Sequence, residues 1–283
     1  MDATDGDGPV ADLHVHTTAS DGVLELDEVP AVAREAGLEC VALTDHDRYH
    51  PGLDAPTTTR EGVTLVRGIE LRVDAGSRQS PRADARSAPA EAGDLQVDLL
   101  GYGLAPTPAL EDLLDRIQRD RIGRAGEIID QVEDRLGVRL DLEPRRGIGR
   151  PHVARAVAES EAPYDYQGAF DHLIGDGCPC YVAREIPSFE RGREVLAEAC
   201  ALVGLAHPLR YPVPEAALAL AADLDAVERY YPYDPPVDDG AVVRVIEERD
   251  LLATGGSDAH DRRLGTAGPP RAAFDRFARR LDL

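Results

Sequence analysis

Asp12-Leu13-His14-Val15-His16-Thr17-Thr18-Ala19-Ser20-Asp21-Gly22 is the stretch that decides the fold of this chain. The run from Val10 to Val15 favours a β-strand, and because side chains alternate along a strand, His14 and His16 lie on one face. Neutral imidazole is a common ligand of zinc, manganese and iron, and Asp21 adds a hard oxygen donor. A His-x-His pair alone is weak evidence, since two surface histidines can have the same spacing.

Four further apolar runs end in residues of the same kind. They lead into Thr44-Asp45-His46, Gly68-Ile69-Glu70, His207-Pro208 and Ser257-Asp258-Ala259-His260. In a β/α barrel the carboxyl ends of the strands converge on one face, where catalytic groups gather. The repeated placement therefore indicates one shared site rather than a scatter of unrelated histidines.

Taken in order, His-x-His, Thr-Asp-His, Gly-x-Glu, Ala-His-Pro and Ser-Asp-Ala-His resemble the PHP family, the polymerase and histidinol phosphatase superfamily of metal-dependent phosphoesterases. The resemblance runs from Asp12 to His260 and is strongest to small stand-alone enzymes that act on nucleotides or RNA ends. It implies an α/β fold, a distorted seven-stranded β/α barrel of the PHP type with a helical insertion. It also implies two or three divalent metal ions that hydrolyse phosphate esters.

The resemblance further implies a set of ligands shared among three ions. The first is held by His14, His16, Glu70 and Asp258; Glu70 bridges to a second, completed by His207 and Asp98; and Asp21, His46 and His260 hold the third. The family usually has a histidine at position 98, so Asp98 departs from the pattern, and its alternative role is that of a solvent-facing acid on an edge strand. Manganese, zinc, iron and magnesium all remain possible.

Composition indicates one barrel domain with an insertion in the 283 residues. The chain has 53 acidic residues against 31 basic ones, a net charge of −22, and no lysine. Such a surface is typical of a protein adapted to molar salt, where charge repulsion is screened. The charge therefore does not exclude a phosphorylated substrate, because the groups that line the site dominate there.

Secondary-structure signals change in the middle of the chain. Residues 1–9 and Asp74–Gly93 have loop composition, and Leu26–Ala36 has a helical pattern. Between Thr107 and Ala199 apolar residues recur at helical spacing, which predicts an insertion at 107–199 between barrel segments 1–106 and 200–283. After it, helices are expected at 215–222, 241–250 and 272–281, with strands at 226–230 and 251–254.

The segment Gly149-Arg150-Pro151-His152 opens a helix within the insertion. Free backbone donors at a helix start suit an anion, so Arg150 and His152 are candidate catalytic residues that hold the phosphate or assist the leaving oxygen. A similar Arg-Pro-His segment occurs in the resembling family, where the insertion forms a lid. The alternative is a surface cation beside an ordinary helical histidine; Arg184 and Arg210 are further candidates that the sequence cannot place.

The remaining signals restrict location and partners. Cys40, Cys178, Cys180 and Cys200 form no Cys-x-x-Cys pair, which argues against a zinc knuckle or a disulfide framework. No signal peptide or membrane span is visible, so we expect a cytoplasmic protein. The expected partner is a small phosphorylated substrate, a nucleotide or a short RNA 5′ end, and no stable protein partner is indicated.

Three functions are compatible with the sequence. The first is hydrolysis of nucleotide phosphate esters by a metal-activated water, as a nucleoside 3′,5′-bisphosphate phosphatase or a 5′-3′ exoribonuclease on short RNA. The second is a phosphatase of the histidinol-phosphate type. The third is a metal-binding regulatory module without activity, which loss of ligands would favour.

Overall fold

The computed structural model describes residues 8–76 and 95–283, and it divides into two compact units. The sheet unit comprises the described residues up to Leu110 together with Pro187–Leu283, and the helical unit comprises Glu111–Ile186. The insertion is thus shorter than the 107–199 expected from the sequence, because α5 (Phe189–Ala199) packs with its buried face on strands of the sheet. Gly192 of α5 lies so close to the sheet that a Cβ there would be 2.4 Å from Val73 Cγ1. Most of the expected loop at Asp74–Gly93 lies outside the described residues.

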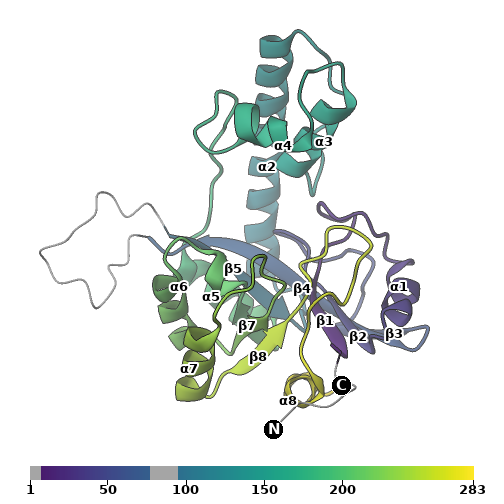
Figure 1. Cartoon of the computed structure of the whole chain (residues 1–283), viewed down its shortest axis with the longest axis vertical. Coiled ribbons are helices and arrows are strands. Elements are labelled where there is room, and N and C mark those ends of the chain that lie inside the picture. Colours follow the sequence, from purple (N-terminus) through teal and green to yellow (C-terminus); the bar gives the residue numbers. More distant parts are fainter. Residues whose placement is uncertain (1–7, 77–94) are drawn as a thin grey trace, which may run out of the picture. The chain divides into compact units, whose positions relative to one another are not determined.

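One curled sheet forms the centre of the sheet unit (Figure 1). Its seven strands in spatial order are β1 (Ala11–Val15), β2 (Cys40–Leu43), β4 (Val63–Asp74), β5 (Gln96–Tyr102), β6 (Leu202–Leu205), β7 (Ala226–Tyr230) and β8 (Leu252–Gly255). A short strand that the sequence did not predict, β3 (Thr57–Arg60), pairs antiparallel with β4. The two ends of the sheet approach each other, since His16 N donates to Ala259 O at 3.0 Å. The predicted distorted seven-stranded β/α barrel is confirmed, and its sheet forms a curled half-barrel.

Strand direction decides which residues reach the functional edge. β5 runs antiparallel to both β4 and β6, whereas the other neighbours along the path are parallel. The amino end of β5 therefore lies beside the carboxyl ends of its neighbours. Asp98, the third residue of β5, consequently stands directly opposite Arg72 of β4.

The inner face of the sheet changes character along the strands. At one end, Leu100, Tyr102 and other apolar side chains pack on Phe274 and Phe277 of α8 (Arg271–Arg280). The Tyr102 and Phe277 rings meet edge to face at a centroid distance of 5.2 Å. Asp98 lies two positions before Leu100 on β5, and because alternate residues of a strand share a face, both side chains lie on the inner face. The inner face of the sheet is thus apolar near α8 and polar near Asp98.

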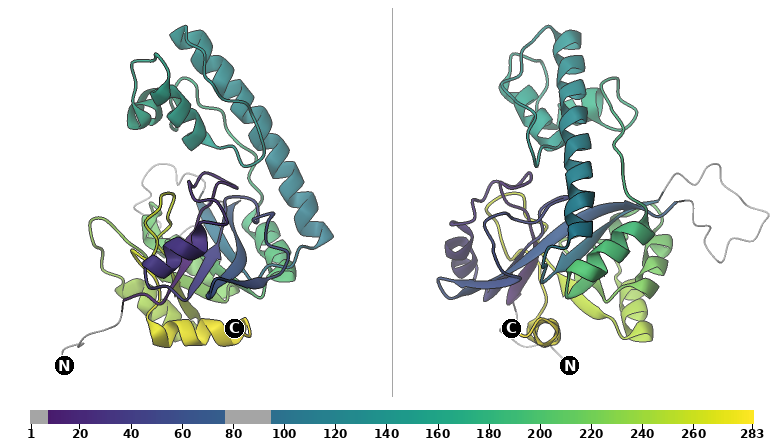
Figure 2. Two further views of the ribbon diagram at one scale, coloured as in Figure 1. Left: turned by 90° about the vertical axis from the view of Figure 1, so that its right-hand side faces the viewer. Right: turned by 180° about the vertical axis from the view of Figure 1, so that it is seen from behind.

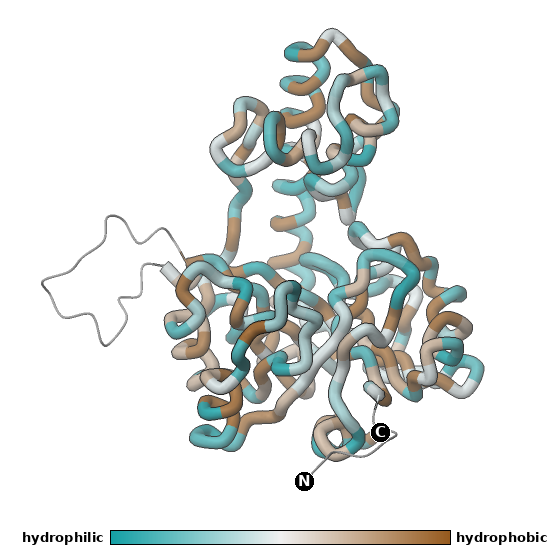
Figure 3. Tube along the Cα trace, viewed as in Figure 1, coloured by the Kyte–Doolittle hydropathy of each residue, from teal (hydrophilic) through white to brown (hydrophobic). Residues whose placement is uncertain are grey.

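Helices cover the outer face of the sheet. α1 (Val29–Glu35) contributes Val29 and Ala33 to a core with Val41 and Leu65. α5, α6 (Pro214–Leu220) and α7 (Gly240–Arg249) lie beside the later strands (Figures 1 and 2). Figure 3 shows hydrophobic residues alternating with hydrophilic ones along these helices. Such amphipathic helices bury one side on the sheet and keep the barrel half rigid.

The helical unit has a core of its own. Its helices are α2 (Pro108–Leu136), which starts in the sheet unit, α3 (Arg150–Glu159), α4 (Tyr166–Ala169) and the π-helical turn Phe170–Ile174. Ile128 and Val132 of α2 pack with Val153 and Val157 of α3 and with Leu173. Across the part of the chain that is described, no helix is long and apolar enough to cross a membrane.

Candidate metal centre

Two buried histidines lie at the end of the first strand: His14 within β1 and His16 directly after it. The register of β1 against β2 shifts between Asp12 and Val15, where His14 lies. Asp12 fixes this segment by accepting from Ser257 N at 2.9 Å and Gly265 N at 2.8 Å, and burial raises its pKa to about 6. Gly256 permits the close approach, since a Cβ there would lie 2.3 Å from His14 N. The first and last motifs are thus packed against each other.

All nine predicted ligands come together at the upper edge of the sheet unit. Eight of them supply donor atoms to three groups, and within each group every atom lies within 4.8 Å of the others. The groups are His16, Asp21, His46 and His260; His14, His16 and Glu70; and Glu70, Asp98 and His207. Asp258 joins them, with Oδ1 at 3.1 Å from His16 Nε2 and 3.5 Å from His14 Nε2.

Glu70 is the centre of the cluster. Its Oε2 lies 2.7 Å from His46 Nδ1 and 3.5 Å from His16 Nε2, and its Oε1 lies 3.2 Å from His207 Nε2 and 3.4 Å from His14 Nε2. Burial raises the pKa of Glu70, yet His46 and His14 hold it well below its usual range. The side chain is therefore a buried carboxylate between imidazoles, which is the placement that a bridging ligand requires.

Asp21 gathers a second set of histidines. Its Oδ1 lies 3.4 Å from His260 Nε2, and its Oδ2 lies 3.8 Å from His46 Nε2. Burial raises the pKa of Asp21, but His46 and His260 lower it well below the ordinary value. The loop is held by Asp45, which accepts from Thr17 N at 2.8 Å and Ser20 Oγ at 2.7 Å. This corner is therefore pre-organised by buried hydrogen bonds.

The backbone of the cluster includes two left-handed residues that are not glycine. His207 has a φ of 25° and Asp258 a φ of 51°. Such conformations persist only where surrounding contacts hold them, and they gather at functional sites. For His207 one such contact is the bond from its N to Glu228 Oε2 at 2.8 Å.

The donor set fits divalent metal ions. Atoms without a hydrogen-bond partner among the described residues include His14 Nε2, His16 Nδ1, Asp21 Oδ1 and Glu70 Oε2, all of them buried. Leaving such atoms unpaired costs about 1–3 kcal/mol each, and more for charged groups. Buried carboxylates also require compensating positive charge. Several ions bound among imidazole and carboxylate donors would satisfy both needs.

Sequence reasoning missed Glu228, a carboxylate directly behind the cluster. Glu228 is fully buried on β7, and its two carboxylate oxygens lie 3.1 and 3.2 Å from His14 Nδ1. Burial lowers the pKa of His14, yet Glu228, followed by Asp258 and Glu70, raises it well above its ordinary value. A carboxylate on Nδ1 turns Nε2 toward the ion site. A single acid inside the predicted strand 226–230 was the only sequence signal.

Three further side chains escaped the sequence analysis or could not be placed by it. Tyr231 donates to Asp258 Oδ2 at 2.9 Å, and Arg210 donates to the same oxygen at 3.0 Å and to Tyr231 Oη at 2.8 Å. Arg72 donates from Nε to Asp98 Oδ1 at 2.7 Å and from Nη2 to Asp98 Oδ2 at 2.6 Å. Arg210 and Arg72 thus put permanent positive charge beside the acids of the cluster.

The predicted catalytic residues Arg150 and His152 lie in the helical unit, at the start of α3. Arg150 Nη1 donates to Asp176 Oδ1 at 2.7 Å, and His152 Nδ1 accepts from Gly149 N at 3.1 Å. His152 is largely buried and caps its own helix. The helix start predicted from Gly149-Arg150-Pro151-His152 is confirmed, whereas the catalytic roles stay predictions.

Arg150 belongs to a group of arginines around Tyr181. The guanidinium carbons of Arg150 and Arg124 lie 5.6 and 6.0 Å from the centre of the Tyr181 ring. Burial and, after it, the nearby guanidinium groups of Arg150 and Arg184 lower the pKa of Arg124 to about 10. Like charges held this close favour an anion.

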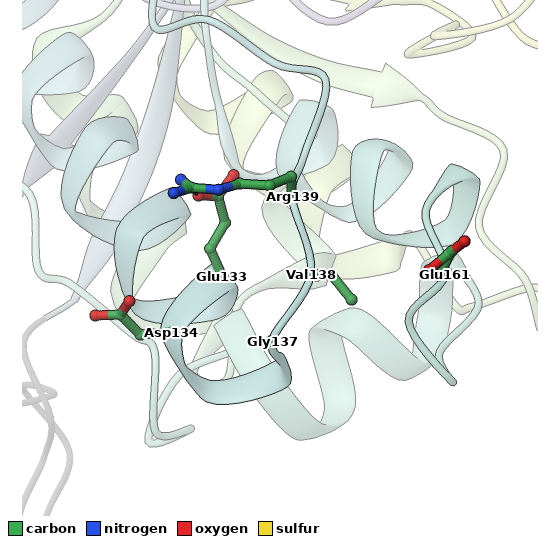
Figure 4. A pocket seen from close by; sticks show the side chains of 6 residues that line it. All are labelled: Glu133, Asp134, Gly137, Val138, Arg139 and Glu161. Carbon is green, nitrogen blue, oxygen red and sulfur yellow. Dashed lines mark hydrogen bonds and ion pairs between the residues drawn. The ribbon is translucent and has the colours of Figure 1, made fainter.

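A separate pocket opens elsewhere in the helical unit (Figure 4). It is lined by Glu133, Asp134, Gly137, Val138, Arg139 and Glu161. Arg139 forms an ion pair with Glu133. Its lining includes carboxylates but no histidine, so the pocket lacks the imidazole donors found in the cluster.

Comparison with known proteins gives relatives at low identity. A family model described as the PHP domain matches residues 12–168, more than half of the chain. A 5′-3′ exoribonuclease of Haemophilus influenzae is 28% identical over 71% of this chain and 69% of its own length. A 3′,5′-nucleoside bisphosphate phosphatase of Chromobacterium violaceum is 29% identical over 71% and 67%. A phosphoribosyl 1,2-cyclic phosphate 1,2-diphosphodiesterase of Eggerthella lenta is 27% identical over 89% and 94%.

Two solved structures share the fold. A metal-dependent phosphoesterase from Bifidobacterium adolescentis superposes with a TM-score of 0.74 at 22% identity, covering 95% of this chain and 96% of its own. An amidohydrolase from Chromobacterium violaceum superposes with a TM-score of 0.70 at 23% identity, covering 96% of each chain. Both matches extend over nearly the whole chain, so the arrangement of strands and helices is shared throughout.

Proposed function

The chain belongs to the PHP domain family of metal-dependent phosphoesterases, and from this premise we propose that its substrates are nucleotides. The reaction is hydrolysis of a nucleoside 3′,5′-bisphosphate or removal of nucleotides from the 5′ end of short RNA. The observation that carries the proposal is the likeness, at 28 and 29% identity, to two relatives named for these activities. Both substrates carry more than one phosphate, and the chain offers arginines for them in both units.

We propose that eight of the nine predicted residues hold the ions. They are His14, His16, Asp21, His46, Glu70, His207, Asp258 and His260. Bound divalent ions of this kind lower the pKa of water and neutralise charge on phosphoryl oxygens. The ninth residue, Asp98, has a bidentate arginine partner and is considered below.

The protein's own residues orient the reaction. Glu228 contacts Nδ1 of His14, so that Nε2 of His14 is available to bind an ion. Glu70 lies between the imidazoles, with Oε1 near His14 and Oε2 near His46. Arg210 is anchored to Asp258 and Tyr231, while its side chain is 52% exposed, so its remaining donors face solvent. A phosphate oxygen of the substrate accepts from these donors, which positions the scissile bond beside the cluster.

The helical unit carries arginine donors of its own for an anion. Arg150 and Arg124 share the Tyr181 ring, and Arg124 Nε donates to the carbonyl of Val182 at 2.6 Å. The carbonyl is neutral, so this bond does not compensate the charge of Arg124. Arg150 binds the anion in this proposal, whereas His152 keeps α3 in place through its bond to Gly149. Tyrosine and guanidinium planes also suit a nucleobase.

Two alternatives from the sequence analysis have less support. The relatives reported above are named for nucleotide, RNA or phosphoribosyl substrates, and none of these three for histidinol phosphate. The regulatory module without activity would have lost ligands, whereas the three donor groups are complete here.

The test is a comparison of substrates. Manganese-loaded protein in molar potassium chloride is given a nucleoside 3′,5′-bisphosphate, a 5′-phosphorylated trinucleotide RNA, phosphoribosyl 1,2-cyclic phosphate and histidinol phosphate. We expect the highest kcat/KM for one of the first two, with Asp258→Ala as the inactive control. A higher kcat/KM for either of the last two substrates would refute the nucleotide assignment.

A further inference from the structure

The buried carboxylates of the metal cluster differ in whether their oxygens have hydrogen-bond partners. Asp21 and Glu70 each have a buried oxygen without a hydrogen-bond partner among the described residues. Asp98 is equally buried, with 1% of its side chain exposed, but both of its oxygens accept from Arg72. The corner formed by Glu70, Asp98 and His207 therefore already contains a guanidinium that occupies both oxygens of its aspartate. In the corner around His14, by contrast, Arg210 bonds to Oδ2 of Asp258, whereas Oδ1 lies 3.5 Å from His14 Nε2 and 3.1 Å from His16 Nε2.

The pairing of Arg72 with Asp98 is built into the sheet. The two residues face each other directly in the antiparallel β4–β5 ladder, so their side chains leave the same face of the sheet. Two parallel N–H···O bonds of 2.7 and 2.6 Å join the planar guanidinium to the carboxylate. Asp98 N also donates to Tyr211 Oη at 2.8 Å, which fixes the backbone at this point.

A metal ion at this corner would meet two obstacles. It would have to remove two charge-assisted hydrogen bonds from Asp98, and it would then stand beside a guanidinium that does not lose its proton. A divalent ion and a guanidinium at contact distance repel each other strongly in a buried site.

We propose that Arg72 takes the place of one metal ion, so that the protein binds two ions and not three. One lies among His16, Asp21, His46 and His260, and the other among His14, His16, Glu70 and Asp258. His207, whose Nε2 lies 3.2 Å from Glu70 Oε1, completes the second of these sites together with Glu70. The inference rests on the proposed metal centre and determines its stoichiometry.

Arg72 also gains a role toward the substrate. Two of its five N–H donors are used by Asp98, and 37% of its side chain is exposed. The remaining donors offer an oxygen of the phosphate a positive partner that is present at any metal concentration.

The experiment counts ions. Metal-free protein is loaded with Mn²⁺, freed of unbound ion by gel filtration and analysed for manganese per chain. We expect two ions in the wild type, two in Asp98→Ala and three in Arg72→Met, because the last change releases the Asp98 carboxylate. Arg60→Met is the matched control, since Arg60 pairs with exposed Asp27 through a 3.1 Å contact; it should bind two.

Three ions in the wild type, or the loss of one ion in Asp98→Ala, would overturn the inference. Anomalous diffraction from manganese-loaded wild-type crystals gives the same answer without a variant: no peak should lie within about 2.5 Å of an Asp98 oxygen. Failure of the proposed metal centre has a different signature. If Asp21→Ala and Asp258→Ala both retained the full wild-type ion count, the centre itself would be wrong, whatever Asp98 does.

Discussion

The sheet unit and the helical unit arrange their charged groups in opposite ways. In the sheet unit, Asp21, Glu70 and Asp258 are buried among histidines at strand ends. In the helical unit, Arg124 and Arg150 gather around one tyrosine. The first arrangement attracts cations, and the second attracts anions. A phosphoesterase needs both, which supports the proposal that hydrolysis belongs to the sheet unit and that the helical unit binds an anion.

The largest expected effect comes from removing a donor in the sheet unit. His14→Ala and Asp258→Ala should each lower kcat/KM by at least about 10²–10³-fold, because loss of an ion removes charge stabilisation in the transition state. Metal content should fall in parallel, as measured by elemental analysis. His172→Ala is the control from the helical unit, where His172 contacts Tyr164 at a ring distance of 5.7 Å. Equal losses in the control and in His14→Ala would break the division of roles.

A smaller effect on metal affinity is expected from changing Glu228, which contacts the predicted ligand His14. Glu228→Gln should weaken metal affinity by about 10–100-fold, because an amide orients His14 without supplying negative charge. Competition with a chelator at fixed pH measures this loss. Glu247→Gln, an exposed change on α7, should leave affinity unaltered. Unchanged affinity in Glu228→Gln would reduce Glu228 to a structural acid.

The same two regions differ in how well the sequence predicted them. The ligands at the ends of apolar runs were found, because strand alternation and barrel geometry bring strand ends together whatever the loops do. Glu70, His207 and Asp258 are cases of this kind, and the structure brings them together. Their role as ligands stays a prediction.

Residues that depend on pairing between strands could not be predicted. Arg72 lies two positions after Glu70 on the same strand, but its contact with Asp98 exists only because β5 runs antiparallel in one particular register. Neither direction nor register can be read from β5 alone. Glu228 was missed for a related reason: one acid in a five-residue strand does not reveal which histidine it faces.

The predicted end of the insertion differs from that of the helical unit, because helical periodicity was the only sequence signal there. The run of helical signals from 107 to 199 continued through α5, so the sequence assigned this helix to the insertion. A helix that covers a sheet and a helix that packs on helices both bury one apolar face. Only the packing of α5 on the strands β4 to β6 distinguishes them.

Substrate binding by the helical unit should give an intermediate effect. Arg124→Ala should raise KM for a nucleoside 3′,5′-bisphosphate about tenfold, the loss expected for a hydrogen bond to a charged group. Manganese content should stay at the wild-type level, and Arg124→Lys should restore part of the affinity. Arg119→Ala on the same helix is the control, since Arg119 is exposed. A changed metal content in Arg124→Ala would show that the two units do not divide the work as proposed.

The smallest effect, a few-fold change, is expected from salt. The 53 acidic residues and the absence of lysine leave a charge of −22, and we propose that both units need screening. The Debye length falls from about 10 Å at 0.1 M salt to about 3 Å at 1 M, so dilute buffer should loosen both units and molar potassium chloride should tighten them.

Metal ions should affect hydrogen exchange differently in the two units. Ions bind only to the folded sheet unit, so at 0.1 M salt Mn²⁺ should slow hydrogen exchange in β1, β4 and β8. In α3 exchange should stay fast until salt is added, because the arginine group binds no cation. Hydrogen exchange with mass spectrometry at both salt concentrations resolves these segments. Slow exchange in both units of the metal-free protein at 0.1 M salt, together with full activity of the manganese-loaded protein at that salt, would refute the adaptation to salt. Protection of α3 by Mn²⁺ alone would instead mean that the helical unit responds to the metal centre, so that the two regions act together.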